Sequence, residues 1–251
     1  MSTHDEQDMT GRVVLVTGGG SGLGRATCVR LAGAGATVLV ADVADDGAQT
    51  TVRGIRAHGG DARPLHLDVT DSSAVDDVLA AAFAEHGTHV DCLVNNAGTD
   101  RGADVIDVTD EQWRSVFGVN VDGPMYTSRA FVRHVLAQGP RDTPADIISV
   151  VSISALTVGS GAAAYNSSKA ALLKLTEVLQ TEAREHGWPI RVCALSPSAM
   201  NTPMMDQWNL PAEKMIDPAG VASLIHRAVT LPPTMVLQSM VVTGRTEYYP
   251  R

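Results

Sequence analysis

Short apolar runs alternate with longer segments of helical periodicity along almost the whole chain. The short runs are rich in β-branched residues, whereas the segments between them repeat apolar residues at the spacing of a helix face. Strict alternation of strand and helix predicts parallel strands joined by right-handed crossovers, and hence an open, doubly wound α/β sheet. The predicted strands are 13–16, 37–41, 65–67, 90–94, 147–151, 190–195 and 240–243, and the predicted helices are 22–34, 46–58, 72–86, 111–136, 164–186 and 218–230.

The chain has no internal repeat, low-complexity block or interdomain linker, so we predict a single domain over residues 11–251. Residues 1–10 are polar and acidic and are predicted to form a disordered tail. No apolar region follows this tail, which argues against a signal peptide and against a membrane span.

Composition narrows the classes of protein. Hydrophobic residues make up 44% of the 251 residues and aromatic residues only 4%, which suits a core of Ala, Val and Leu between helices and a parallel sheet. The formal net charge of −9 argues against nonspecific binding to nucleic acid or to an anionic membrane.

The cysteines and histidines show no pattern of a disulfide or metal site. Cys28, Cys92 and Cys193 are odd in number and far apart, which favours buried, reduced thiols and a cytoplasmic protein. The eight His residues form no ligand pattern, so no metal is predicted.

A glycine-rich turn follows the first predicted strand and leads into the first predicted helix. Its sequence, Thr-Gly-Gly-Gly-Ser-Gly-Leu-Gly over 17–24, places glycines where a tight turn needs them, where backbone N–H groups approach a pyrophosphate, and where helix packs on strand. In this context the motif predicts dinucleotide binding, and a merely flexible turn is the alternative. The residues predicted to contact the cofactor here are Gly18, Ser21, Gly22, Leu23 and Gly24.

Asp42 ends the second predicted strand. A carboxylate there can accept hydrogen bonds from both ribose hydroxyls of adenosine and would repel a 2′-phosphate. Val43 and Ala44 follow it, and Ser21 precedes Gly22, so no basic residue stands where a 2′-phosphate would need one. The pattern favours NAD over NADP, with a solvated strand-end Asp as the alternative.

Two more strand ends carry candidate cofactor contacts. The third predicted strand leads into Asp68 and Val69, where the Asp side chain can approach an adenine amino group, and the fourth leads into Asn95-Asn96-Ala97-Gly98, where small residues let the backbone run alongside a cofactor. Ligands of doubly wound sheets bind at this carboxyl edge.

Ser152, Tyr165 and Lys169 are the candidate chemical groups. Tyr165 and Lys169 stand four apart in the first turns of a predicted helix and share a face, and Ser152 ends the preceding strand. A free Tyr titrates near ~10, and a nearby cation such as Lys169 or an oxidised nicotinamide favours the phenolate. Ser152 can then hold a substrate oxygen while Tyr165 transfers the proton. A Tyr and a Lys at this spacing are also common on an ordinary helix surface.

Together these residues resemble the short-chain dehydrogenase/reductase family. The matching motifs are 17–24, Asn-Asn-Ala-Gly over 95–98, Asn120 within 118–123, Ser152, and Tyr165 with Lys169. The resemblance runs from Gly11 to about Gly244. It implies a single Rossmann domain with a seven-stranded parallel sheet in the order 3-2-1-4-5-6-7.

The resemblance also implies roles. Tyr165 would be the general acid/base, Ser152 would orient the substrate oxygen, and Lys169 would lower the pKa of Tyr165 and hold the nicotinamide ribose. Asn120 would kink its helix and anchor a water molecule in a proton relay. Hydride would pass between the substrate carbon and NAD, which makes the chain a dehydrogenase for a secondary alcohol and ketone pair.

The region after the sixth predicted strand departs from the family pattern. Pro197 and Thr202 match residues expected to contact the cofactor, but Ser198 stands where the family usually has Gly. By position, residues 199–216 would form a substrate lid, whose Met and Trp side chains suggest an apolar or aromatic alcohol or ketone; packing against the protein or a neighbouring subunit is the alternative. The predicted substrate residues are Ser152, Ser154, Gly159, Tyr165, Ser198, Met204, Met205 and Trp208.

Two other functions are alternatives. The first is an NADP-linked carbonyl reductase, which Asp42 disfavours because its carboxylate would repel the 2′-phosphate of NADP. A regulatory protein that binds the dinucleotide without turnover is the alternative from another class, and the complete set of Asn120, Ser152, Tyr165 and Lys169 speaks against that. Because family members pair through their long helices, we expect a homotetramer or homodimer.

Overall fold

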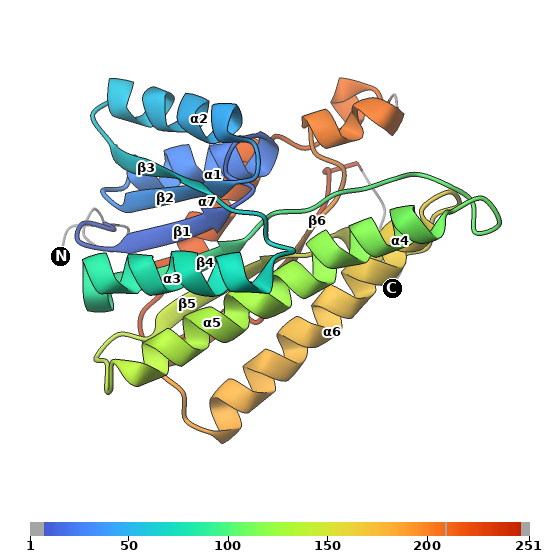
Figure 1. The fold of residues 1–251 in the computed structure, drawn as a ribbon. Helices are drawn as coiled ribbons and strands as arrows, with labels where there is room; N and C mark the ends of the chain where they lie inside the picture. Colours follow the sequence, from blue (N-terminus) through green and yellow to red (C-terminus); the bar gives the residue numbers. More distant parts are fainter. Residues whose placement is uncertain (1–7, 209, 247–251) are drawn as a thin grey trace.

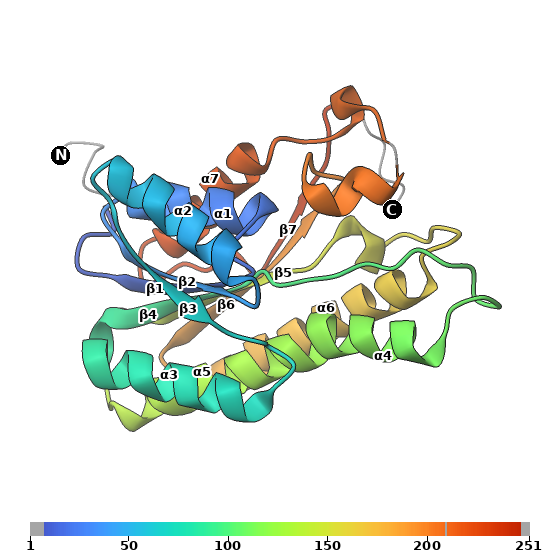
Figure 2. The same ribbon diagram turned by 45° about the horizontal axis from the view of Figure 1, so that its top comes forward.

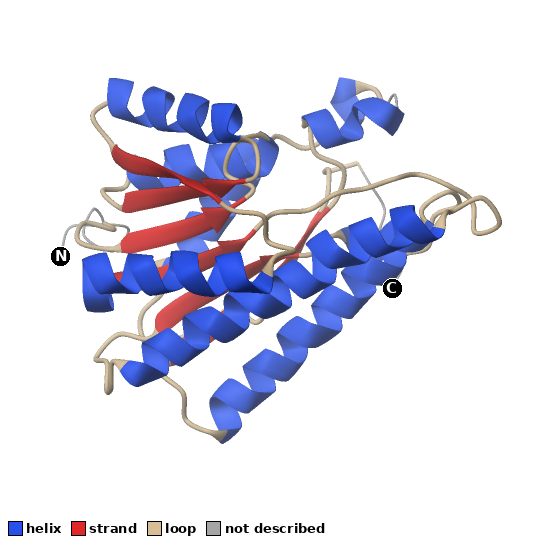
Figure 3. Ribbon diagram, in the orientation of Figure 1, coloured by secondary structure: helices blue, strands red, loops and turns tan. Residues whose placement is uncertain are grey.

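Seven parallel strands form one sheet in a computed structural model that describes residues 8–208 and 210–246 (Figures 1 and 3). Every neighbouring pair in the order β3-β2-β1-β4-β5-β6-β7 is parallel, which confirms the predicted topology. The strands are β1 (Val13–Thr17), β2 (Thr37–Asp42), β3 (Asp61–His66), β4 (Val90–Asn95), β5 (Ala145–Val150), β6 (Ile190–Pro197) and β7 (Ser239–Val242).

Helices cover both faces of the sheet (Figure 2). One layer holds α1 (Gly22–Ala32), α2 (Asp45–Ala57) and α7 (Pro218–Val229), and the other holds α3 (Ser72–His86), α4 (Asp110–Phe117), α5 (Gly123–Ala137) and α6 (Ala163–Glu185). Short helical segments complete the described chain: Gly87–His89, Gly118–Asp122, Ile153–Ala155, Pro203–Trp208 and Ala212–Lys214.

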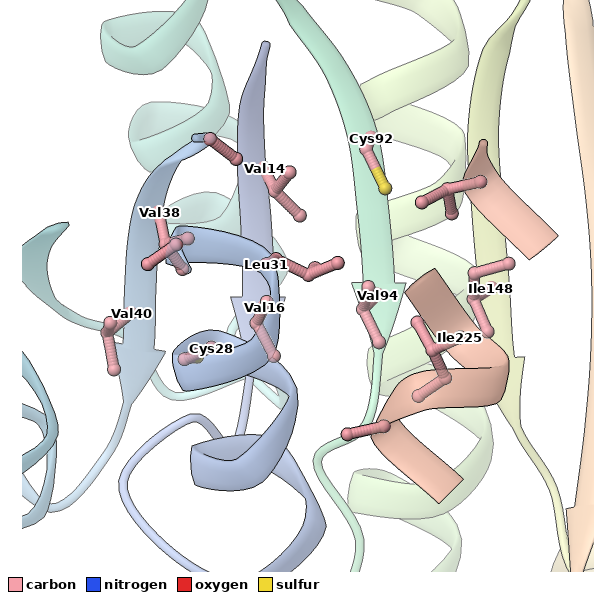
Figure 4. Close-up of a cluster of buried hydrophobic side chains, with 14 of the residues drawn as sticks. Val14, Val16, Cys28, Leu31, Val38, Val40, Cys92, Val94, Ile148 and Ile225 are labelled. Carbon is pink, nitrogen blue, oxygen red and sulfur yellow. The ribbon is translucent and has the colours of Figure 1, made fainter. Parts of the chain in front are cut away.

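Two large apolar cores, one on each face of the sheet, explain why a strand such as β1 is apolar on both sides. In Figure 4, Val16 of β1 and Val94 of β4 face Leu31 of α1 and Ile225 of α7. Leu15 belongs to the core on the opposite face, so consecutive residues of β1 are both buried. A parallel strand covered on both faces reads as a continuous apolar run for this reason. Among the described residues, no helix is long and apolar enough to cross a membrane.

The structure changes the predicted third strand. We predicted 65–67 from its apolar residues, whereas β3 runs over Asp61–His66. This strand is at the edge of the sheet, most of its side chains are exposed, and it contains Pro64. Edge strands tolerate proline and polar residues because one side of the backbone makes no ladder bonds, so the apolar signal was absent.

The N-terminal boundary of the fold also differs from the prediction. Met9 was predicted to lie in a disordered tail ending at residue 10, but its side chain is 0% exposed and its N–H donates to the Ala34 carbonyl oxygen at 2.8 Å. Burial of this apolar side chain against α1 orders the segment. Residues 1–7 of the predicted tail lie outside the described residues.

A buried ion network joins the first ends of four strands. Arg12, just before β1, lies 2.8 Å from both Asp91 of β4 and Asp146 of β5, and Arg191 of β6 lies 2.8 Å from the other oxygen of Asp146. The Asp146 side chain is 3% exposed. The network lies at the amino edge of the sheet, away from the predicted ligand edge, so its role is structural.

Asp146→Ala should therefore destabilise the protein by about 3–5 kcal/mol, because it leaves two buried guanidinium groups without their shared carboxylate. Urea unfolding monitored by circular dichroism measures the change. Asp110→Ala is the control: it removes an exposed ion pair with Arg114 and should leave the unfolding midpoint nearly unchanged. Equal midpoints for wild type and Asp146→Ala would contradict a stabilising network.

Candidate active site

A cavity of about 760 Å³ opens at the carboxyl edge of the sheet. It is the place where a doubly wound fold binds ligands, since the crossovers from β1 and β4 leave in opposite directions. The cavity brings together the predicted residues Gly18, Ser21, Gly22, Leu23, Asp42, Asp68, Val69, Asn96, Ala97, Gly98, Ser152, Ser154, Gly159, Tyr165, Lys169, Pro197, Ser198, Thr202, Met204, Met205 and Trp208. Of the predicted residues, Gly24 and Asn120 lie outside its lining.

The glycine turn is built for close backbone contact. Gly18 has φ = 64°, and a Cβ there would lie 2.9 Å from the Ala97 Cα. A Cβ on Gly24 would lie 2.0 Å from the Gly18 carbonyl oxygen, so no larger residue fits without moving the turn. Ser21, at the N-cap of α1, makes no side-chain cap. Gly22 and Leu23, the first residues of α1, line the cavity, so the start of this helix is placed where it can bind an anion such as a pyrophosphate.

The carboxylate of Asp42 is held rigidly beside this turn. Its Oδ2 accepts from the Gly20 N–H and its Oδ1 from the Ala44 N–H, both at 2.8 Å. Each carboxylate oxygen keeps a lone pair for a further donor. Asp42 therefore can bind hydroxyl groups of a ligand in the cavity without any side-chain rearrangement.

The turns after β1 and β4 are tied to each other. The Thr17 hydroxyl accepts from the N–H groups of Asn96 and Ala97 at 3.1 and 3.0 Å, and the Asn96 amide donates to the carbonyls of Thr17 and Gly18 at 2.9 and 3.1 Å. The Asn-Asn-Ala-Gly motif thus holds the glycine turn in position and also contributes Asn96, Ala97 and Gly98 to the lining of the cavity.

Ser152, Tyr165 and Lys169 meet at the other end of the cavity. The Lys169 Nζ donates to the Val150 carbonyl at 2.9 Å and lies 5.6 Å from the centroid of the Tyr165 ring. Lys169 is 3% exposed and Ser152 is 8% exposed. The Ser152 Oγ accepts from the Ser154 N–H at 3.1 Å, which fixes its position at the start of the loop.

Burial dominates the electrostatics of the Tyr165–Lys169 pair. Burial raises the pKa of Tyr165 to about 12, a hydrogen bond with Ser152 lowers it, and the charge of Asp100 raises it further. Burial likewise lowers the pKa of Lys169 to about 8. We predicted that Lys169 lowers the pKa of Tyr165, but with the protein's own groups burial dominates both values. The ammonium lies over the ring and donates to a backbone carbonyl, and it does not contact the phenolic oxygen by any hydrogen bond found among the described residues.

Asn120 interrupts the long predicted helix 111–136. The structure divides this helix into α4, a π-helical turn Gly118–Asp122 and α5. The Asn120 amide donates to the Thr99 carbonyl at 2.9 Å and to the Ser168 hydroxyl at 3.0 Å, and its oxygen accepts from the Thr99 N–H at 2.8 Å. Its side chain therefore positions the loop after β4, and its part in a proton relay stays a prediction.

Ser198, after β6, is buried, and its hydroxyl has no hydrogen-bond partner among the described residues. Its N–H donates to the Val242 carbonyl at 2.8 Å, which continues the pairing with β7, and the residue is 4% exposed. Met204, Met205 and Trp208 lie in the short helix Pro203–Trp208 and line the cavity, as Ser154 does.

Asp100 lines the cavity and was missed by the sequence analysis. It accepts a hydrogen bond from the Trp208 Nε1 at 3.1 Å. Burial raises its pKa. The signal that could have found it is its place, two residues beyond the Asn-Asn-Ala-Gly motif at the end of β4.

Comparison with known proteins gives one family. A model of the family described as short chain dehydrogenase matches residues 12–213. The 1-deoxy-11-beta-hydroxypentalenate dehydrogenase of Streptomyces avermitilis is 37% identical over 192 residues, which are 76% of this chain and 69% of that protein. The cyclopentanol dehydrogenase of Comamonas testosteroni is 36% identical over 200 residues, which are 78% of this chain and 76% of that protein. A metagenomic short-chain oxidoreductase solved in complex with NADP superposes with a TM-score of 0.81 at 25% identity, covering 95% of this chain and 99% of that one.

Proposed function

Because this chain belongs to the short-chain dehydrogenase/reductase family, and is thus an oxidoreductase, we propose that it interconverts a secondary alcohol and a ketone with NAD. One observation carries the proposal: a single cavity joins a glycine turn, where a pyrophosphate fits, to the Ser152–Tyr165–Lys169 group. The first end can hold a dinucleotide and the second can exchange a proton with a substrate oxygen.

The residues around the glycine turn fit the cofactor. The close backbone contacts at Gly18 and Gly24 exclude side chains from the turn, and Asp42 offers free lone pairs for ribose hydroxyls. Asp68, Val69, Asn96, Ala97, Gly98, Pro197 and Thr202 complete the proposed contacts. When bound, oxidised NAD supplies the hydride acceptor and a positive charge.

The roles of the chain's own groups follow from their positions. Ser152 would hold the substrate oxygen, and the Tyr165 hydroxyl would exchange a proton with it. With a pKa of about 12, Tyr165 is protonated at neutral pH and donates its proton during ketone reduction. Alcohol oxidation needs the phenolate, so its rate should rise as pH rises towards this pKa. Lys169 would hold the nicotinamide ribose and favour the phenolate when it is charged.

The charges of the cavity favour NAD over NADP. Among the described residues that line it, Lys169 is the one cation, and it belongs to the Ser152–Tyr165 end. Arg25, on α1, contacts the Gly20 carbonyl and donates to Thr51 at 3.1 Å, and it is not part of the lining. A 2′-phosphate beside Asp42 would therefore meet a carboxylate without a compensating cation. The NADP complex of the metagenomic relative keeps an NADP-linked carbonyl reductase as the competing assignment.

Asp42→Ala should reduce the preference for NAD over NADP, measured as the ratio of the two kcat/KM values, by about 10- to 100-fold. It removes a charged hydrogen-bond acceptor for the ribose and the repulsion of a 2′-phosphate. Asp45→Ala removes an exposed carboxylate nearby that pairs with His66, and should leave the ratio unchanged. A preference for NADP in the wild type would contradict the role of Asp42.

The substrate end of the cavity suits an apolar alcohol. Met204, Met205 and Trp208 offer adaptable apolar and aromatic surface, and the relative named for cyclopentanol is consistent with such a substrate. For the protein itself we propose a cytoplasmic homotetramer or homodimer. A second apolar hollow between α5 and α6 is lined by Val132, Leu136, Leu175 and Val178, of which Leu136 and Val178 are 39% and 45% exposed, and would suit pairing of two copies.

The direct test is the formation of reduced cofactor, followed by absorbance, with NAD and NADP compared over a panel of cyclic, aliphatic and aromatic secondary alcohols. We expect turnover with NAD and a preference for bulky apolar alcohols. Turnover with NADP alone would overturn the cofactor assignment and leave the reaction class. Measurable NAD binding by calorimetry without turnover across the panel and its ketones would favour a non-catalytic regulatory protein.

A further inference from the structure

A hydrogen bond across the mouth of the cavity joins two segments that are far apart in sequence. Trp208, the last residue of the short helix Pro203–Trp208, donates from its indole Nε1 to the Asp100 Oδ2 at 3.1 Å. Both residues line the cavity. The other oxygen of Asp100, Oδ1, is shielded from solvent and accepts no hydrogen bond of normal geometry from the described residues.

The indole ring of Trp208 packs against the backbone of two glycines, Gly102 and Gly161. A Cβ on Gly102 would lie 2.9 Å from the Trp208 Cη2, and one on Gly161 would lie 4.0 Å from the same atom. The two glycine segments are joined because the Ala103 N–H donates to the Gly161 carbonyl at 2.8 Å. The ring therefore rests on backbone at Gly102, and a methyl group there would displace it.

Asp100 is held from the catalytic side as well. Its neighbour Thr99 exchanges two backbone hydrogen bonds with the Asn120 side chain, which also donates to Ser168 on α6. Ser168 directly precedes Lys169. A continuous chain of hydrogen bonds thus runs from α6 through Asn120 and Thr99 to the residue that receives Trp208.

The charge of Asp100 reaches the Tyr165–Lys169 pair. It raises the pKa of both Tyr165 and Lys169, and Lys169 in turn lowers the pKa of Asp100. Asp100, Tyr165 and Lys169 line the same cavity, and among the described residues Asp100 is the charged group that acts on both members of the pair. The other charged side chains of the loop between β4 and α4 and of the segment Pro203–Trp208 are exposed to solvent: Arg101, Asp104, Asp107 and Asp206.

We propose that Asp100 is a positioning residue for the reaction: through Trp208 it holds the segment Pro203–Trp208 at the substrate end of the cavity, and its charge couples this arrangement to Tyr165 and Lys169. The inference rests on the proposed function. It separates two properties of one carboxylate, the acceptor that holds Trp208 and the charge that acts on the catalytic pair, and variants can remove them one at a time.

Trp208→Phe removes the N–H that donates to Asp100 and keeps an aromatic ring. Gly102→Ala removes no polar group, but its added methyl group would occupy the position of the indole ring. Both should raise the substrate KM by roughly tenfold, the loss expected for one hydrogen bond to a charged acceptor. Both leave the charge of Asp100 in place, so the pH dependence of kcat/KM should stay where it is in the wild type.

Asp100→Asn keeps a carbonyl acceptor for Trp208 and removes the charge. Its KM should stay within about twofold of the wild type, whereas the pH at which alcohol oxidation reaches half its maximum should fall by about half a unit or more. The sign follows because removal of a nearby anion lowers the pKa of Tyr165 and of Lys169 alike. The first proton lost by the coupled pair therefore leaves at lower pH, whichever group carries it.

Two controls match these substitutions outside the cavity. Asp104→Asn removes the same charge from an exposed position in the same loop, and Trp113→Phe changes an indole that stacks on Phe117 in α4. Neither residue lines the cavity, and neither variant should change KM or the pH profile. A shift in Asp104→Asn as large as that in Asp100→Asn would show a general charge effect and overturn the proposal.

Fluorescence provides a test that does not depend on turnover. In a Trp113→Phe/Trp188→Phe background, Trp208 is the single tryptophan of the chain, and its emission should move to longer wavelength in Asp100→Ala and Gly102→Ala but not in Asp100→Asn. Identical emission in all four proteins would overturn the contact, even if the enzyme is active. The same wavelength shifts in a protein that shows no dehydrogenase activity would retain the contact and reject the proposed function.

Discussion

Replacement of Tyr165 by Phe should lower kcat for alcohol oxidation by at least ~10²-fold while NAD affinity stays close to that of the wild type. The substitution removes one oxygen atom, the one placed to take the substrate proton. A loss of about 100-fold in kcat is the low end of the effect expected when general acid–base catalysis is removed. The ring itself remains to pack beneath Lys169, whose Nζ lies 5.6 Å from its centroid. Steady-state rates and calorimetric titration with NAD measure the two quantities.

Tyr126→Phe is the matched control. Tyr126 lies on α5 beside Arg129, outside the cavity lining, and the same loss of a hydroxyl there should leave kcat within about twofold. Normal turnover by Tyr165→Phe would mean that another group handles the proton. Equal losses in both variants would indicate an indirect structural effect.

Gly24→Ala should weaken NAD binding by about 100-fold or more. Its Cβ would stand 2.0 Å from the Gly18 carbonyl oxygen and 2.5 Å from the Asn96 Nδ2, so the turn must move away from the position in which its backbone can meet a pyrophosphate. Gly24 does not line the cavity, and therefore the loss would come from the shape of the turn. Calorimetry gives the affinity, and circular dichroism and thermal unfolding show whether the variant is folded.

Gly54→Ala provides the comparison for this substitution. Gly54 is an exposed residue in α2, and a Cβ there meets nothing within 4 Å. The variant should bind NAD normally and gain about 0.5–1 kcal/mol of stability, since Ala favours a helix more than Gly. A folded Gly24→Ala protein with wild-type NAD affinity would contradict the assignment of the turn to the pyrophosphate.

Elements with a local sequence signal could be predicted before the structure. Strands covered on both faces, such as β1, are mostly apolar on both sides, so their positions follow directly from the sequence. The glycine turn is likewise readable because its spacing follows from backbone contact between the turn and the start of α1. The parallel order of the sheet follows from the alternation of strands and helices and from the family resemblance.

Features set by tertiary contact were missed. β3 is an exposed edge strand without an apolar pattern, and Met9 is ordered by a core that only the folded chain provides. The dominance of burial over the pKa values of Tyr165 and Lys169 was also missed, because no sequence pattern reports how deeply a side chain is buried. The effect of Lys169 on Tyr165 stays a prediction. Asp100 was missed because its partner, Trp208, is 108 residues away in the sequence and is brought to it only by the fold.

The transfer of deuterium tests the central claim most directly. The wild-type protein is incubated with NAD and a secondary alcohol that carries deuterium on the carbinol carbon. The mass of the reduced cofactor is then measured by mass spectrometry. Hydride transfer from that carbon within this cavity predicts reduced NAD that carries one deuterium and forms in equal amount with the ketone. Tyr165→Phe should form at most about 1% as much product in the same time, in line with a loss of at least ~10²-fold. Reduced cofactor without the label, or ketone formed without reduced cofactor, would contradict the account.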